Sequence, residues 1–124
     1  RIPEARGEST RIELRNPDPS CNPYLALAVI IMAGLDGIEN KIQPPAPTNK
    51  NIYNMTEEER EELGIVRLPS NLGSALRELM GSRLARETLG DHIFEKYVGA
   101  KLKEWDDYRI RVTKWELDEY LTKY

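Results

Sequence analysis

The 124-residue chain has one cysteine, Cys21, and one histidine, His92. A single cysteine excludes an internal disulfide framework and fits a reducing compartment. It stands in a turn without basic neighbours that would activate it, so we expect it to be inert. His92 has no second histidine or cysteine at ligand spacing, so the sequence does not indicate a zinc site there. We expect a structural role for His92.

Basic blocks and long apolar runs are also missing. The formal net charge is −3 and no stretch is strongly basic, which argues against a nucleic-acid partner. The first ten residues, RIPEARGEST, lack the apolar region of a secretory signal. The apolar run over residues 24–35 is too short to cross about 30 Å of hydrocarbon. We therefore expect no membrane partner and a cytoplasmic location.

Apolar and charged residues occur in ordinary globular proportions, 40% and 31%. The length suits one domain or part of one. The chain begins at Arg1 without an initiator methionine, and we expect it to be part of a longer protein.

Cap and breaker residues predict a mostly helical chain. Asn22 and Pro23 have the residue types of a helix cap and a first helical position, ahead of the apolar run YLALAVIIMAGL. This run is apolar on all sides, which predicts burial all round. A proline-rich connector, NKIQPPAPTNKNIY, follows it. The further helices predicted from capping signals, glycines and apolar periodicity are 56–63, 72–80, 82–90, 91–112 and 113–121.

The first twenty residues predict a short β-strand instead. In RIELR, residues 11–15, charged and apolar residues alternate, as on the two faces of a strand, and Pro17 and Pro19 end the pattern. The predicted fold class is therefore mainly α with a short N-terminal β-strand. The predicted division is an active-site strand and turn over 1–20 and a helical region over 21–124, within a single partial domain.

The RIELR row has two interpretations on spacing alone. Arg11, Glu13 and Arg15 form either a solvated strand face or a site at which the carboxylate ligates a hard cation while the guanidinium groups grip an anion. A cation with guanidinium groups suits phosphoryl transfer, which depends on positioning and charge stabilisation. The sequence has no glycine-rich phosphate loop of the Walker or dinucleotide kind.

Several stretches together resemble one family. RIELR joined to NPYLALAVIIMAGLDGI, and then NIYNMTEEE, LPSNLGSAL, GDHIFEKYV and KEWDDYR, are similar to the C-terminal part of the catalytic domain of type I glutamine synthetases. The resemblance extends over essentially the whole chain. It implies the helical C-terminal portion of an α+β catalytic domain.

The resemblance also implies a reaction and its residues. ATP phosphorylates the γ-carboxylate of glutamate, and ammonia displaces the phosphate to give glutamine, with Mg²⁺ or Mn²⁺ as cofactor. Glu13 resembles a metal ligand, Arg15 the arginine that holds glutamate, and Arg1 and Arg11 residues that contact ATP. No catalytic residue is assigned within the chain. The family assembles as stacked hexameric rings, so we expect a homo-oligomer of the full-length protein.

Two alternatives remain open. The chain could serve as a non-catalytic oligomerisation module, with the apolar residues of 113–124 as an anchor. It could also belong to a ligase that joins glutamate to an amine larger than ammonia. Because one carboxylate and three arginines do not complete a metal site, we expect the isolated chain to be inactive.

Overall fold

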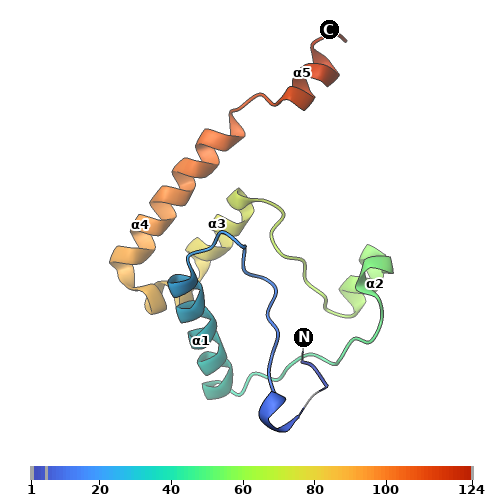
Figure 1. The fold of residues 1–124 in the computed structure, drawn as a ribbon, viewed down its shortest axis with the longest axis vertical. Helices are drawn as coiled ribbons and strands as arrows, with labels where there is room; N and C mark the ends of the chain where they lie inside the picture. The colour runs from blue at the N-terminus through green and yellow to red at the C-terminus, as the bar shows by residue number, and fades with distance from the viewer. Residues whose placement is uncertain (1, 5, 124) are drawn as a thin grey trace. The chain divides into compact units, whose positions relative to one another are not determined.

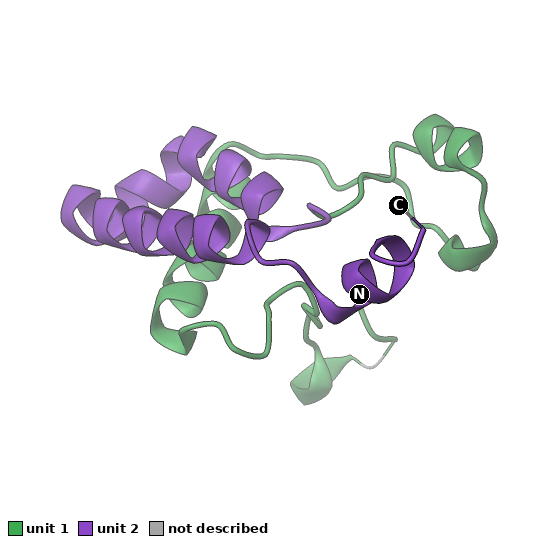
Figure 2. Ribbon diagram, turned by 90° about the horizontal axis from the view of Figure 1, so that it is seen from above, with its two compact units in different colours: residues 1–68 green, residues 69–124 purple. Residues whose placement is uncertain are grey.

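A computed structural model describes residues 2–4 and 6–123, and these residues are mostly helical (Figure 1). The chain divides into two compact units, residues 1–68 and 69–124, which Figure 2 distinguishes. The elements of the first unit are the 3₁₀ turns η1 (Gly7–Ser9) and η2 (Ile52–Asn54) and the helices α1 (Pro23–Glu39) and α2 (Glu57–Glu62). Those of the second are α3 (Leu72–Gly81), α4 (Arg83–Arg109) and α5 (Lys114–Tyr120).

The predicted starts of α1 and α2 are confirmed. The Asn22 side-chain oxygen accepts hydrogen bonds from the backbone N–H groups of Tyr24 at 3.0 Å and Leu25 at 3.4 Å, and Pro23 is the first residue of α1. A reciprocal pair of hydrogen bonds between Thr56 and Glu59 forms the capping box of α2. The proline-rich connector between α1 and η2 has no helix, as predicted.

The predicted N-terminal strand is not found. Residues 11–16 form neither helix nor strand, and no strand occurs in the described part of the chain. The physical reason is that a strand exists through backbone pairing with a neighbour. Alternating side chains predict the faces of a strand but do not supply the partner edge. The predicted strand at residues 11–15 is therefore corrected to an irregular segment without a paired neighbour among the described residues.

Burial of α1 on all sides is also not found within this chain. None of its residues is buried, and Ile31 is 59% exposed. Ile12 and Leu14, the apolar residues of the RIELR row, are exposed as well. No helix among the described residues, α1 included, is both long and apolar enough to cross a membrane.

The second unit has a small core where α3 and α4 meet. Ala85, Phe94 and Val98 of α4 are buried together, with Leu79 and Leu89 packed against them. Burial of these apolar side chains is the main favourable term that holds the two helices together.

Candidate functional site

Arg11, Glu13 and Arg15 lie together in the irregular segment that precedes α1. The Arg11 Nη2 group donates to Glu13 Oε1 at 3.3 Å, and the Arg15 Nη2 group donates to Glu13 Oε2 at 3.1 Å. One carboxylate therefore bridges two guanidinium groups, each two residues away along the chain. The three charged side chains share one side of the backbone, as the alternation predicted, although no strand holds them.

The exposure of these groups differs. The Glu13 side chain is 25% exposed, whereas those of Arg11 and Arg15 are 53% and 78% exposed. Ion pairs between such exposed groups stabilise a fold only weakly. The row therefore contributes little to stability, and its two guanidinium groups are accessible to solvent.

Arg6 orders the loop that leads to this row. Its guanidinium donates to the backbone carbonyls of Pro3 at 2.7 Å and Glu4 at 3.0 Å. Sequence reasoning did not find this residue, because its acceptors are backbone atoms that every residue carries. Arg1, the predicted ATP contact, lies outside the described residues.

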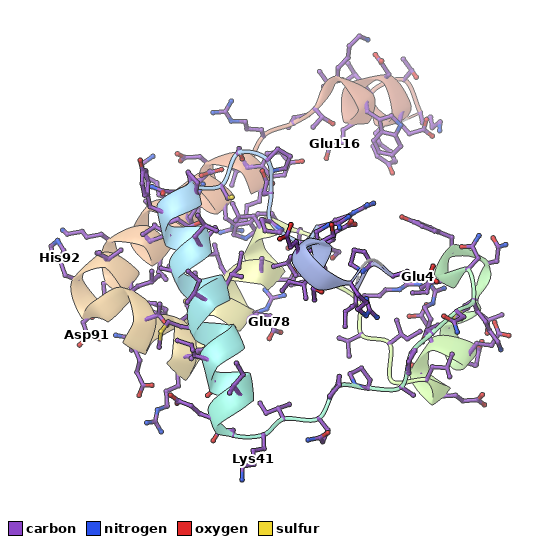
Figure 3. The ribbon with its side chains drawn as sticks, turned by 60° about the horizontal axis from the view of Figure 1, so that its bottom comes forward. Glu4, Lys41, Glu78, Asp91, His92 and Glu116 are labelled. Carbon is purple, nitrogen blue, oxygen red and sulfur yellow. The ribbon has the colours of Figure 1, made fainter. Side chains whose placement is uncertain are left out.

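The histidine and the cysteine of the chain are not part of a metal-ligand cluster among the described residues. His92 is exposed on α4 (Figure 3), and Cys21 is a half-buried free thiol. Within the described part of the chain, no group of three or more His, Cys, Asp or Glu residues is placed to hold a metal ion. Glu13 therefore does not belong to a preformed cluster of three or more such ligands among the described residues.

A carboxylate beside two guanidinium groups provides the side-chain types that bind cations and anionic groups. Comparison with known proteins identifies the family of the chain. The family described as "Glutamine synthetase, catalytic domain" matches residues 1–120, and the chain belongs to that family. The family predicted from the sequence motifs is confirmed.

Curated relatives named glutamine synthetase match nearly the whole chain. Identity is 56% over 124 residues for the protein of Clostridium saccharobutylicum, 54% over 122 for that of Methanosarcina mazei and 57% over 121 for that of Thermotoga maritima. These matches cover 100%, 98% and 98% of this chain but 28%, 27% and 28% of the relatives. The chain therefore spans little more than a quarter of the length of the relatives that it matches.

Proposed function

We propose that this chain supplies one edge of the active site of a cytoplasmic, ATP-dependent glutamate–ammonia ligase. The observation that carries the proposal is the Glu13 carboxylate held between Arg11 and Arg15 in a chain that matches the glutamine synthetase catalytic domain over residues 1–120. In the proposed reaction, the γ-phosphoryl group of ATP passes to the γ-carboxylate of glutamate. Ammonia then displaces phosphate from the acyl phosphate and forms the amide.

Each residue of the row has a proposed role. Glu13 ligates Mg²⁺ or Mn²⁺, Arg15 binds the glutamate substrate, and Arg11, together with Arg1, binds ATP phosphates. The carboxylate oxygen of Glu13 is the donor type that these hard cations prefer. When bound, the metal neutralises charge on the phosphate oxygens.

The structure imposes one condition on these roles. Both Glu13 oxygens accept a hydrogen bond from a guanidinium group. Glu13 would hold a metal through one of these oxygens only after that oxygen releases its arginine, and the released guanidinium group would then be available to an anionic substrate. Metal and substrate binding at this row are expected to support each other for this reason.

Residues 1–20 form the proposed active-site segment, and residues 21–124 the helical region that supports it. A single carboxylate does not complete a metal site, so the isolated chain is expected to be inactive. The remaining ligands belong, in this proposal, to regions that the relatives have and this chain does not cover.

A chimeric enzyme tests the role of Glu13. In it, this chain replaces the matching segment of the Thermotoga maritima relative, which is 57% identical over 121 residues. Glu13→Ala should lower glutamate- and ammonium-dependent ADP release about 10³-fold, the effect of losing a charge contact in phosphoryl transfer. Glu62→Ala removes an exposed carboxylate from α2, outside residues 1–20, and should leave the rate unchanged.

The outcomes separate the alternatives. A loss of less than about threefold for Glu13→Ala, against this expected 10³-fold loss, would remove Glu13 from the metal site. Activity with a larger primary amine but not with ammonium would favour the alternative ligase. Full activity of the isolated chain would contradict the proposal that it supplies one edge of a larger site.

Assembly of subunits is a second candidate function, and the exposed apolar side chains of the C-terminal helix α5 favour it. Trp115, Leu117, Tyr120 and Leu121 are all at least 46% exposed. The Trp115 and Tyr120 rings meet edge to face at 5.9 Å, which gives the helix an ordered aromatic surface. Aromatic side chains of this kind are enriched at the centres of interfaces. In the chimera, Trp115→Glu should dissociate the oligomer in analytical ultracentrifugation if α5 is an assembly anchor.

A further inference from the structure

Helix α4 changes direction at Gly90 (Figure 1). The backbone there has φ 70° and ψ 155°, and every other residue of α4 is helical. This combination of dihedral angles is essentially restricted to glycine. A Cβ atom on Gly90 would meet nothing within 4 Å, so the requirement for glycine comes from the backbone conformation and not from lack of space.

The bend brings together residues that a straight helix keeps apart. Ala85 is buried in one cluster with Phe94 and Val98, which follow it by nine and thirteen residues. In a continuous helix these separations correspond to about 13 and 20 Å along the axis. The core of the second unit therefore exists only while α4 is bent.

Arg86 reaches across the bend to three residues beyond Gly90. Its Nη1 donates to Asp91 Oδ1 at 2.7 Å and lies 3.6 Å from Glu95 Oε1. Its guanidinium carbon lies 4.4 Å from the centre of the Phe94 ring. These partners follow Arg86 at spacings of five, eight and nine residues, whereas side chains pair along a regular helix at three and four.

We propose that Arg86 is an ionic clasp that holds α4 bent at Gly90, and that α4 has a second, straight state when the clasp opens. The sequences on either side of Gly90 contain no proline and are rich in good helix formers. A continuous helix is therefore the natural competitor of the bent form. The clasp adds to the buried cluster of Ala85, Phe94 and Val98 in holding the direction of residues 91–109 relative to 83–89. Salt weakens the clasp because its charges are exposed.

Arg83 provides a matched control on the same helical turn. Its Nε donates to Glu87 at 2.6 Å, an ordinary pair at i and i+4 that does not cross Gly90. Arg83→Gln removes one exposed arginine and its ion pair with Glu87. Arg86→Gln removes one exposed arginine and its ion pairs with Asp91 and Glu95. Only the second change removes contacts that depend on the bend.

Nuclear Overhauser contacts in the full chain test the proposal. The parent should show contacts from the Ala85 methyl group to the Phe94 or Val98 side chains, and Arg83→Gln should keep them. Arg86→Gln should reduce their intensity at least about threefold while the helix content stays the same, since a continuous helix separates these groups by more than about 10 Å. Gly90→Ala should abolish them, because alanine cannot adopt the bent backbone.

Unchanged contacts in Arg86→Gln would overturn the clasp, and unchanged contacts in Gly90→Ala would overturn the straight state. If Arg86→Gln fails to fold, the parent is compared at about 0.05 M and about 1 M salt, where screening lengths differ severalfold. Weaker contacts at high salt with retained helix content would support the clasp. Equal contacts at both salt concentrations would refute it.

Discussion

Gly73, near the start of α3, is buried against the side chain of Trp105 in α4. A Cβ atom at this position would lie 2.6 Å from Trp105 Cε2 and 2.8 Å from its Nε1. Both distances are below 3.0 Å, which non-bonded contacts of real Cβ atoms essentially never show, and the indole ring is rigid. Gly73 is thus required by close packing, with no demand on its backbone conformation.

Gly73→Ala should therefore destabilise the chain. Overpacking of a tight contact typically costs about 1–3 kcal/mol, which outweighs the gain in helix propensity at a first-turn position. The measurement is the free energy of unfolding in urea. Gly99→Ala is the matched control, because Gly99 is exposed in α4 and its Cβ would meet nothing within 4 Å.

Gly99→Ala should stabilise the chain by about 0.5–1 kcal/mol through helix propensity alone. Equal effects of the two substitutions would contradict the packing of Trp105 on Gly73. The expected result is a lower free energy of unfolding for Gly73→Ala and a higher one for Gly99→Ala.

Part of the arrangement of Arg11, Glu13 and Arg15 could be predicted from the sequence. The Arg–Glu–Arg contacts are local, between residues two apart, so alternation alone was enough to predict that they share one side. The hydrogen bonds of Arg6 to backbone carbonyls had no such signal. The further ligands that the proposed metal site needs are not local, and no pattern within RIELR specifies them.

At the scale of elements, the helix starts were predictable because their causes are local. Asn22, Thr56, Asn71, Ser82 and Thr113 each cap the helix that follows through a side-chain oxygen. The interruption near Gly90 was also predicted, from the glycine. The bend that it produces, and the clasp across it, depend on contacts between residues far apart in the helix and were not predicted.

The strand at 11–15 and the burial of α1 were not found for a common reason. Both depend on a second surface, a neighbouring strand in one case and a covering layer in the other. The apolar content of α1 identifies a helix that needs a covering layer. The alternation at residues 11–15 identifies a segment that needs a neighbouring strand. Neither feature contains information about whether that layer or strand belongs to the same stretch of chain.

The cap of α5 makes its helix content depend on pH. Hydrogen bonds from Thr113, first from its backbone N–H and then from its side chain, lower the pKa of the Glu116 carboxyl. A carboxyl whose pKa is lowered by folding stabilises the folded form fully above its unfolded pKa of about 4.3. That contribution is lost as the pH falls through the lowered pKa.

We therefore expect α5 to lose helix content on acidification from about pH 5 to about pH 2, a range that begins near the ordinary glutamate pKa of about 4.3 and extends below it. The measurement is the ¹³Cα chemical shift of Leu117 in an NMR titration. Glu116→Gln should flatten the transition. Glu119→Gln removes a carboxylate later in the same helix and should leave it in place, and a flat titration of the parent would rule out this role of Glu116.

At the scale of the whole molecule, exposed apolar surface is the dominant feature. Along α1, exposed large apolar side chains recur at steps of three and four residues and so form one stripe, made of Tyr24, Leu27, Ile31, Leu35 and Ile38. Soluble monomers rarely expose contiguous apolar patches of more than a few hundred Å². A stripe with this spacing is the kind of surface that two helices bury against each other.

The isolated chain should therefore self-associate through α1. Burying apolar surface is worth about 25 cal/mol per Å² before the costs of association are subtracted, so the stripe favours association at high concentration. Sedimentation velocity of the parent should show a weight-average mass that rises with concentration.

Ile31→Lys places a charge in the middle of the stripe and should shift the chain toward monomer, because an unpaired charge strongly disfavours burial. Thr48→Lys adds the same charge at an exposed position of the proline-rich connector and should leave the association unchanged. A parent that stays monomeric at every concentration would show that the stripe does not drive association, and an equal shift in both variants would attribute it to net charge.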